Sequence, residues 1–536
     1  MLPFMRALLR LTLVVLAASV LVRLPAGAQV RPVYDLGAAG LTQALEELQT
    51  TASLLHIGAH PDDEDSALLA RTARGDNARV AYLSLTRGEG GQNIIGTELF
   101  EALGVIRTEE LLQARALDGA GQFFTRAIDY GFSKTREEAA AKWDEREILG
   151  DVVRVIRTFR PLVVSARFSG TPADGHGQHQ LAGYLAPLAF RAAGRRDAFP
   201  EQFAEGLRPW QPRALYVNGN DPQAIAVQTG VFDPVLGRSY GEIAAEGRSQ
   251  HKSQEMGTIE RRGPARSLLR RVEPSGLAPS DSVFGGLDTG LTGIATLAGL
   301  PEGTIANELN TLAAAARRAL DEYEPLEPSR IVPVLAEGLR AARAARAALE
   351  GAAGTPDARA DADFLLSSKE QSFADALARA AGLVVDALAD RETVVPGSTF
   401  GVAIRTFYPD PPAVRITAGG ITAPAGWTVT PAGSGREVTI AGGETPADAR
   451  PFVITSPPTA VPGQPYFLAA PREGDRYQWL DAASRALPFG APVLDAWLTF
   501  EAGGAEATIH RAVEYVDRDP GSPLRRTPGA SQARPG

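Results

Sequence analysis

One histidine and three acids stand almost side by side in "HPDDE", residues 60–64, directly after the apolar run "SLLHIGA". The run has the length and composition of a buried strand, and open α/β sheets bind their ligands at the carboxyl ends of such strands. Crowded carboxylates repel one another unless a cation holds them together. The segment therefore predicts a metal ion held by His60 and by Asp62 or Asp63.

A second polar segment, "SGTPADGHGQHQ", carries His176 and His179 directly after another strand-like run, "PLVVSA". Two histidines and one carboxylate leave coordination positions open, as in catalytic rather than structural zinc sites. Zinc lowers the pKa of a bound water to roughly 7 and polarises a carbonyl, so that a nearby carboxylate can take a proton as water attacks. On this basis one of the paired aspartates is a ligand and the other a base. The spare histidine, in protonated form, stabilises the oxyanion.

Each segment also has a structural alternative. The acids of the first segment could cap the start of a helix and interact with its dipole, and the histidines of the second segment could be ordinary loop residues. The combination of the two segments favours the metal site. The other candidates are expected to have structural roles: Glu64 as an acid of the first helical turn, His56 as a core histidine, and His251 and His510 as structural or exposed residues.

The elements that must position these residues follow an alternating pattern over residues 30–290. "SLLHIGA", "ARVAYLSLT" and "PLVVSARF" are strand-like, and "REILGDVVRVIRTF" has the apolar stripe of an amphipathic helix. Strand, helix and strand at this spacing are typical of βαβ units. We therefore expect an α/β fold with a Rossmann-like, mostly parallel sheet and flanking helices.

Two further regions follow. Residues 296–390 are rich in Ala, Leu, Arg and Glu, and an apolar stripe predicts helix as far as Leu388. Residues 391–516 contain short alternating runs broken by Pro and Gly, among them "TFGVAIR", "REVTI", "PFVIT", "PYFLAA" and "AWLTF". This pattern predicts a C-terminal antiparallel β-sandwich, immunoglobulin-like, as an accessory domain. The tail 517–536 has no apolar face and is expected to be disordered.

The N-terminus has the features of an export signal. Arg6 and Arg10 precede the apolar run Leu11–Val22, and "LPAGAQ" offers a cleavage site after Ala28. The run is shorter than the roughly 20 residues that span a bilayer. We expect residues 1–28 to be a signal peptide, the mature chain to be secreted or periplasmic without stable membrane insertion, and the first domain to span 29–295.

Composition narrows the function further. The net charge is −9, without long blocks of one sign, which argues against nucleic acid and anionic membranes as partners. The chain has no cysteine, which excludes disulfides, a thiol nucleophile and cysteine-ligated zinc. Any metal must be held by His, Asp and Glu. Neither a Walker-type lysine motif nor a G-x-S-x-G elbow occurs.

The two segments, with "SLTRGEGGQN", "RTEELLQARALDGAGQFF" and "IRTFRPLVV" between them, resemble the PIG-L/LmbE family of zinc-dependent N-deacetylases, in a secreted bacterial branch. The resemblance covers about residues 50–260. It implies the following roles: metal ligands His60, Asp63 and His179, general base Asp62, and oxyanion stabiliser His176. It also implies hydrolysis of the acetamido group of an N-acetylglucosamine-like sugar or oligosaccharide, an amide hydrolase reaction.

One position departs from the family pattern. Many members carry an acid between the two later histidines, where this chain has Gly177 and Gln178, and Asp174 is a candidate to tune His176 instead. "RGEGGQN" lacks the third glycine of a dinucleotide motif, so Glu89 and Asn93 are interpreted as polar contacts in a pocket wall. Glu89, Asn93 and Asp174 are thus possible substrate-binding residues.

Two other classes of function stay open. A catalytically idle, secreted carbohydrate-binding protein could have kept the fold, although a binder needs no Asp62. A non-haem iron oxygenase could use His60, Asp62 and a later histidine as a facial triad, although such triads normally lie in jelly rolls. The expected cofactor is Zn²⁺, with Fe²⁺ or another divalent metal as alternatives. The sequence predicts no oligomeric state.

Overall fold

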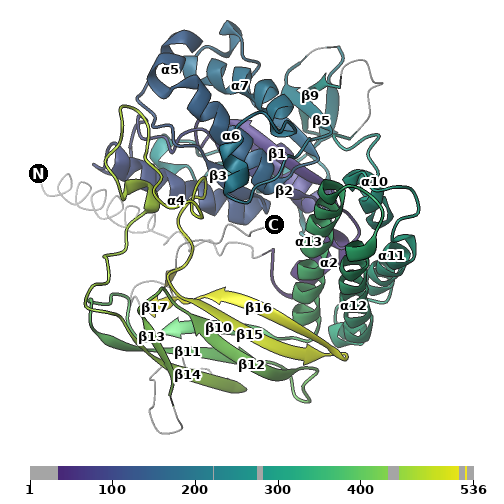
Figure 1. Ribbon diagram of the computed structural model, residues 1–536. Coiled ribbons are helices and arrows are strands. Elements are labelled where there is room, and N and C mark those ends of the chain that lie inside the picture. The colour runs from purple at the N-terminus through teal and green to yellow at the C-terminus, as the bar shows by residue number, and fades with distance from the viewer. Residues whose placement is uncertain (1–33, 221, 275–281, 433–445, 518–524, 528–536) are drawn as a thin grey trace, which may run out of the picture.

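The computed structural model describes residues 34–220, 222–274, 282–432, 446–517 and 525–527 (Figure 1). The expected signal peptide, residues 1–28, lies outside the described residues, as does most of the tail from 517. Within the described part of the chain, no helix is both long and apolar enough to cross a bilayer.

A seven-stranded sheet forms the centre of the N-terminal half, in the order β3-β2-β1-β4-β5-β9-β6. β1 pairs in parallel with β2 and β4, whereas β9 runs antiparallel to β5 and β6. All residues of β1 are buried, which explains why its sequence is a continuous apolar run. The strands are β1 Ser53–Gly58, β2 Arg79–Ser84, β3 Gly121–Phe124, β4 Val163–Ala166, β5 Ala214–Asn218, β6 Ile225–Gln228 and β9 Arg266–Glu273. The prediction of a mostly parallel sheet is confirmed, with antiparallel pairing at one edge.

Helices flank this sheet, and α6 packs on α7 (Figure 1). In a second group, α9 packs on α3 and α4. The predicted stripe of α6 is buried throughout, from Ile148 to Phe159. The helix ends there because Arg160 adopts a left-handed conformation before Pro161. The helices are α2 Gly37–Glu47, α3 Ser66–Ala70, α4 Glu101–Asp118, α5 Arg136–Trp143, α6 Glu145–Phe159, α7 Gly177–Ala193, α8 Glu201–Ala204 and α9 Tyr240–Arg248, and a short hairpin joins β7 Phe232–Asp233 to β8 Arg238–Ser239.

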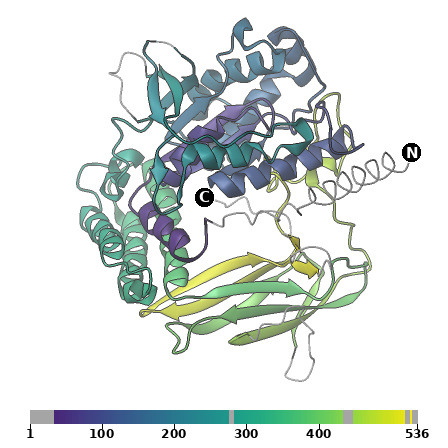
Figure 2. The same ribbon diagram turned by 180° about the vertical axis from the view of Figure 1, so that it is seen from behind.

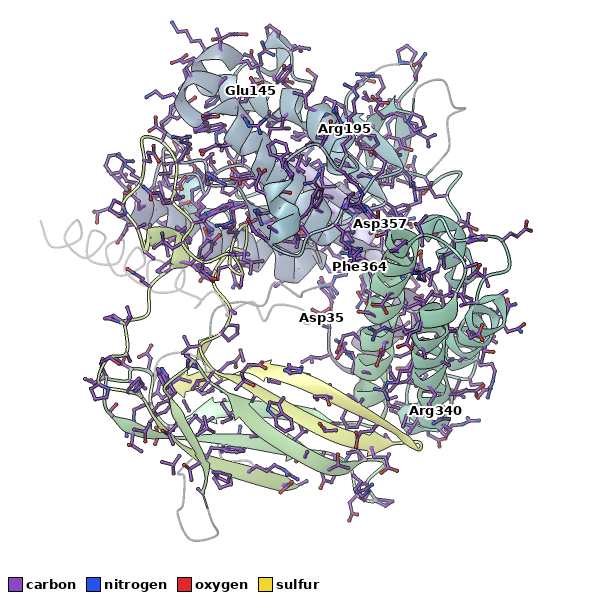
Figure 3. All side chains as sticks on the ribbon, viewed as in Figure 1. Asp35, Glu145, Arg195, Arg340, Asp357 and Phe364 are labelled. Carbon is purple, nitrogen blue, oxygen red and sulfur yellow. The ribbon has the colours of Figure 1, made fainter. Side chains whose placement is uncertain are left out.

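A helical layer follows, made of α10 Ile294–Ala298, α11 Ala306–Asp321, α12 Val332–Ala348 and α13 Pro356–Ala380. The prediction of helix as far as Leu388 is wrong. Helix α13 ends before Gly382, whose φ of 70° is unfavourable for other residues, and Val384–Ala389 forms strand β10. The layer contacts both neighbours: Asp357 pairs with Arg208 of the α/β domain, and Arg340 donates to Gly504 of the sandwich (Figure 3).

The C-terminal half forms two antiparallel sheets, β10-β11-β14-β13 and β12-β15-β16. Alternate residues of β15 are buried, as expected for a strand with one face in a core. The predicted strand "PYFLAA" is wrong, since Tyr466–Leu468 is a 3₁₀ turn, and "REVTI" lies outside the described residues. The strands are β11 Thr399–Phe407, β12 Arg415–Thr422, β13 Thr428–Pro431, β14 Asp448–Thr455, β15 Asp495–Ala502 and β16 Ala505–Ala512, followed by β17 Tyr515–Asp517 paired with β18 Arg525–Thr527.

The connection between β14 and β15, residues 456–494, leaves the sandwich and packs on the α/β domain; we call it the arm (Figures 1 and 2). Backbone hydrogen bonds join it to the edge beyond β3, from Phe124 N–H to Ala486 O at 2.9 Å and from Tyr477 N–H to Arg126 O at 2.8 Å. The buried apolar side chains of the sheet, the helical layer, the sandwich and the arm belong to one contiguous cluster. The sandwich is therefore joined to the α/β domain through a shared core.

Candidate metal centre

The turn after β1 brings His60 and Asp63 together. The Oδ2 oxygen of Asp63 accepts hydrogen bonds from the backbone N–H groups of Ala59, at 3.1 Å, and His60, at 2.7 Å. The hydroxyl of Tyr82, from β2, donates to the His60 carbonyl at 2.6 Å. These contacts fix the turn at the carboxyl end of the central strand.

The second segment reaches the same place from α7. His176 is the N-cap of this helix, so His179 lies on its first turn. Gly177 must be glycine here, because a Cβ would lie 2.2 Å from the carbonyl oxygen of Thr135. The ring of His179 also stacks on Phe168, with centroids 4.0 Å apart.

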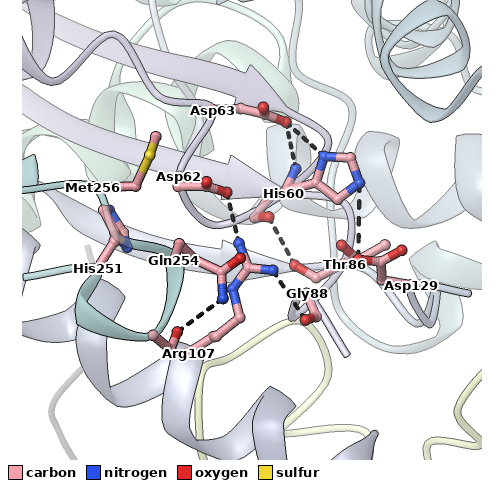
Figure 4. Close-up of polar contacts among 12 residues, drawn as sticks. His60, Asp62, Asp63, Thr86, Gly88, Arg107, Asp129, His251, Gln254 and Met256 are labelled. Carbon is pink, nitrogen blue, oxygen red and sulfur yellow. Dashed lines mark hydrogen bonds and ion pairs between the residues drawn. The ribbon is translucent and has the colours of Figure 1, made fainter. Parts of the chain in front are cut away.

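Three potential metal ligands thus converge: His60, Asp63 and His179. The Nδ1 atom of His60 lies 3.0 Å from Asp63 Oδ2 (Figure 4). The same atom lies 3.2 Å from His179 Nε2, which in turn lies 3.4 Å from Asp63 Oδ1. Asp62 is not a member of this group.

The outward nitrogens of both rings have acceptors. His60 Nε2 lies 2.8 Å from Gln178 Oε1, and His179 Nδ1 lies 3.2 Å from the carbonyl oxygen of Asp174. With protons on these outward nitrogens, the lone pairs of His60 Nδ1 and His179 Nε2 both face Asp63. Metal-bound histidines usually donate their second ring N–H to an acceptor of the protein in this way. The two histidine nitrogens and the carboxylate of Asp63 are ligands that fit a divalent ion such as zinc.

The charges of the cluster support the same interpretation. Burial alone would lower the pKa of His60, but the neighbouring carboxylates of Asp63 and Asp129 outweigh it and raise this pKa to about 9. Burial opposes ionisation of Asp63, yet His60 and His179 hold the pKa of its carboxyl well below its usual range. The site therefore stabilises a positive charge between these side chains.

Asp62 points to a different partner. Its Oδ1 atom accepts a hydrogen bond from Arg107 Nη2 at 2.6 Å, and Arg107 Nη1 donates to the carbonyl of Gly88 at 3.0 Å (Figure 4). Arg248 donates to the Asp62 carbonyl at 3.2 Å. Within the described residues, the Oδ2 atom of Asp62 accepts no hydrogen bond, so one carboxylate oxygen is available beside the ligands.

His176 lies beside the two ligand rings, with its centroid 5.2 Å from that of His60 and 5.0 Å from that of His179. Its Nδ1 atom accepts from the backbone N–H of Gln178 at 3.2 Å, which leaves Nε2 to carry the proton. Burial, followed by the neighbouring His60 and His179, lowers the pKa of His176 to about 4. The neutral ring with a free Nε2–H is therefore favoured, contrary to the protonated form expected from the sequence.

The three possible substrate-binding residues are engaged within the protein. Both oxygens of Asp174 accept N–H groups of the turn at residues 169–171, and only its carbonyl contacts His179, so it does not tune His176 as expected. Asn93 bonds to its own loop, at Ile95 and Glu98.

Glu89 is the third of these residues, and it is buried. Its Oε2 atom accepts the N–H of Asp129 at 3.0 Å. Burial raises the pKa of this carboxyl to about 7. The hydroxyl of Tyr477, from the arm, interacts electrostatically with Glu89. Within the part of the chain that the structure describes, neither Tyr477 Oη nor Glu89 Oε1 has a hydrogen-bond partner of ordinary geometry.

The sequence did not assign roles to Arg107, Asp129 or Gln178. Gln178 Nε2 donates to Asp129 Oδ1 at 3.1 Å and to the Gly131 carbonyl at 2.8 Å, which orients the amide oxygen toward His60. The only signal for Gln178 was its departure from the family's acid. Arg107 lies in the "RTEELL" segment, one of those that resemble the family, but nothing in its spacing indicates contact with Asp62.

The remaining histidines behave largely as expected. His56 is a satisfied core residue, bonded to Ser165 and to the Asp65 N–H, and His510 is exposed and paired with Asp495. His251 is buried, 3.0 Å from Glu64 Oε1. The prediction that Glu64 is a first-turn acid is wrong, because Asp65 caps α3 and Glu64 lies before the helix, buried against His251 and Arg115.

Comparison with known proteins bears on the same segment. Residues 55–190 match the family model PIG-L, described as GlcNAc-PI de-N-acetylase. A mycothiol S-conjugate amidase of Streptomyces coelicolor is 28% identical over 203 residues, covering 35% of this chain and 68% of the amidase. A 1D-myo-inositol 2-acetamido-2-deoxy-alpha-D-glucopyranoside deacetylase of Kineococcus radiotolerans is 30% identical over 200 residues, covering 32% of this chain and 53% of that protein.

Among solved structures, the N,N'-diacetylchitobiose deacetylase from Pyrococcus horikoshii is 18% identical, with a TM-score of 0.30, and the match covers 38% of this chain and 70% of that one. The chain thus spans about half the length of the inositol-glycoside deacetylases it matches. The match to the family model falls within the α/β domain, where the candidate ligands lie.

Proposed function

We propose that this protein is a metal-dependent N-deacetylase acting on an N-acetylglucosamine-like sugar, a proposal supported by the match of residues 55–190 to the PIG-L family model. The observation that carries the proposal is the convergence of His60, Asp63 and His179, with the free carboxylate oxygen of Asp62 on the adjoining turn. The amidase and deacetylase relatives support amide hydrolysis, and the latter is named for a 2-acetamido sugar.

In this proposal His60 Nδ1, Asp63 and His179 Nε2 hold the metal, with zinc as the first candidate. A divalent ion in such a site polarises an amide carbonyl and lowers the pKa of water. Gln178 and the Asp174 carbonyl keep the outward nitrogens of the two rings protonated and the rings in place.

Asp62 is the general base. Arg107 holds its Oδ1 atom, so Oδ2 takes a proton from the water that adds to the amide carbon. The same carboxyl then returns the proton to the nitrogen as the C–N bond breaks, which gives the free amine and acetate.

His176 stabilises the charge that develops on the carbonyl oxygen. Because Nδ1 accepts a backbone hydrogen bond, Nε2–H is the donor that the ring offers to this oxygen. A neutral donor suffices here, in agreement with the lowered pKa of the ring.

The expected location is outside the cytoplasm, a proposal that depends on the export-signal pattern of residues 1–28. The other functional classes have less support. The oxygenase triad would need Asp62 as a ligand, and Asp62 pairs with Arg107 instead. A carbohydrate-binding protein without activity would need no such base.

The first test is acetate release from a panel of N-acetylated sugars and oligosaccharides by the mature chain, metal-stripped and then reconstituted with zinc. Release should require the metal. Asp62→Asn should lower kcat by roughly 10²- to 10⁴-fold, the usual contribution of a general base, while the variant still binds one zinc ion per chain.

The matched control is Asp197→Asn, which removes an exposed carboxylate paired with Arg195, away from the candidate ligands. It should leave kcat unchanged. Activity that survives metal removal, or an Asp62→Asn enzyme as active as the wild type, would contradict the proposed mechanism. Metal binding without acetate release from any compound would favour the binding protein.

A further inference from the structure

A polar groove of about 630 Å³ lies beside the candidate metal centre. Glu64 and Asp65, which directly follow the candidate ligand Asp63, form part of its wall. Arg248 forms another part and donates to the carbonyl of Asp62. The groove is therefore lined by the residues that directly follow the turn with the proposed base and ligand, and its size is typical of sites for small ligands.

Three arginines line this groove: Arg167 after β4, Arg248 at the end of α9 and Arg266 at the start of β9. Within the part of the chain that the structure describes, none of the three forms an ion pair with a carboxylate. By contrast, many arginines elsewhere are paired, for example Arg107 with Asp62 and Arg126 with Asp151.

The acids of the groove do not neutralise these arginines, because other groups engage them. Glu64 faces His251 and Arg115 in the protein interior. Asp65 accepts from the Leu68 N–H, from Ser267 Oγ at 2.8 Å and from Asn218 Nδ2 at 2.7 Å. The groove thus offers unpaired guanidinium groups in a chain whose net charge is −9.

Asn218 adds a second kind of group. Because its Nδ2 donates to Asp65, its amide orientation is fixed, and its Oδ1 atom is buried without a hydrogen-bond partner among the described residues. A buried acceptor without a partner is costly, and a ligand hydroxyl would satisfy it. The groove therefore combines donors for an anion with an acceptor for a hydroxyl.

We propose that this groove binds the anionic part of the substrate, a carboxylate or phosphate carried by the saccharide whose acetamido group lies at the metal centre. Guanidinium groups bind both anions through paired, charge-assisted hydrogen bonds. The assignment of this anion to the substrate rests on the proposed function. The binding site itself rests on the arginines and Asn218.

Binding is measured without turnover, on the zinc-loaded Asp62→Asn protein, by calorimetry at low salt. The probes are N-acetylglucosamine, N-acetylglucosamine 6-phosphate and N-acetylmuramic acid, which differ in having no anion, a phosphate or a carboxylate. We expect at least one anionic probe to bind about 10-fold or more tightly than the neutral sugar, with the preference shrinking as salt is added.

Arg167→Gln and Arg266→Gln should each reduce this preference roughly 10-fold, the loss expected for one charge-assisted hydrogen bond. Arg261→Gln, which removes an exposed arginine that does not line the groove, is the matched control and should keep the preference. Equal affinity for all three probes, or a preference that persists in both groove variants, would overturn the proposal.

The outcomes separate this proposal from the proposed function. Preferential anion binding that depends on Arg167 and Arg266, without acetate release by the wild type, would support the anion-binding groove and contradict the proposed deacetylase activity. Acetate release from neutral sugars, with no preference for anionic probes, would do the reverse. Comparison of the phosphate and carboxylate probes identifies which anion the groove accepts.

Discussion

At the scale of single residues, Gln178 is the most informative position of the site. Its side chain is a neutral amide that accepts from His60 Nε2 and is itself held by Asp129. A carboxylate in this position would place a negative charge next to the candidate metal ligand His60, whereas an amide orients the ring of His60 without adding charge. The geometry therefore assigns Gln178 to positioning His60.

Gln178→Ala should weaken zinc binding by about 10- to 100-fold, because His60 loses the partner that fixes its ring. The affinity is measured by competition with a chromogenic chelator. Gln180→Ala, on the same helix, removes contacts to Lys134 and Gly175 but none to a ligand and should bind zinc like the wild type. Equal affinities for both variants would contradict the role of Gln178.

His56 makes stability depend on pH. Burial lowers its pKa from 6.5 to about 4, so the unfolded chain takes up this proton at a higher pH than the folded one. Stability should be complete above pH 6.5 and fall as the pH drops toward 4, by an amount of order 3 kcal/mol. Urea unfolding at pH 7 and pH 5 should show a smaller difference for His56→Gln than for the wild type. An NMR titration of His56 near pH 6.5 would contradict this prediction.

The sequence predicted the residues that converge in the site but not the contacts that organise them. The spacing of "HPDDE" and "GHGQHQ" was enough to expect His60, an aspartate and a later histidine together, because both segments follow parallel strands that pair directly. The choice of Asp63 and His179 came from the resemblance to the family. Arg107 lies on a helix distant in sequence, and its ion pair with Asp62 depends on how α4 packs. No local pattern reports such a contact.

At the scale of elements, strands and helices were predictable where a periodic pattern was long, as in α6. The stripe through α13 was misleading after Ala380, since Val384 and Leu388 continue its spacing but Gly382 breaks the helix. The arm was not predictable, because its residues pack on another domain instead of forming a strand. Its clearest partner is Arg87, buried just after β2.

The guanidinium of Arg87 is satisfied largely by the arm. It donates to the carbonyls of Pro488, at 2.8 Å, and Leu487, at 3.0 Å, and lies 3.6 Å from the ring centroid of Phe467. Arg87→Ala should lower the free energy of unfolding by roughly 3 kcal/mol or more, since it leaves the buried carbonyl of Pro488 without its donor and creates a cavity. The carbonyl of Leu487 keeps the hydroxyl of Tyr466 as a donor. Limited proteolysis should then cut the arm faster.

Arg485→Ala is the control within the arm. It removes a partly exposed ion pair with Glu205, which should cost at most about 1 kcal/mol. Equal destabilisation by the two substitutions would contradict the idea that Arg87 anchors the arm.

At the scale of the whole molecule, the α/β domain, the helical layer and the sandwich share one apolar core. Independent accessory modules usually have a core of their own and a polar interface. Here the arm completes the edge of the seven-stranded sheet, and Arg340 joins the helical layer to the sandwich through a hydrogen bond to Gly504.

Calorimetry of the mature chain should therefore show a single cooperative unfolding transition, with equal calorimetric and van't Hoff enthalpies. A chain ending at residue 390 should be poorly soluble, because the surfaces that the arm and the sandwich cover become exposed. Two separate transitions, or a soluble and active short form, would show that the sandwich is dispensable.

The large sequence separation between the arm and its partners in the α/β domain also affects when the protein can finish folding during synthesis. Arg87 and the carbonyl of Pro488 are separated by 401 positions in the chain. At a synthesis rate of about 5 to 20 residues per second, the ribosome adds the arm on the order of tens of seconds after Arg87. Until then, the carbonyl groups that accept hydrogen bonds from Arg87 do not exist. During that interval, the backbone groups of Phe124 and Arg126 at the edge of the sheet and the guanidinium of Arg87 lack the hydrogen-bond partners that the arm provides. The nascent chain is therefore most prone to aggregation late in synthesis, and folding is completed only after nearly the whole polypeptide exists.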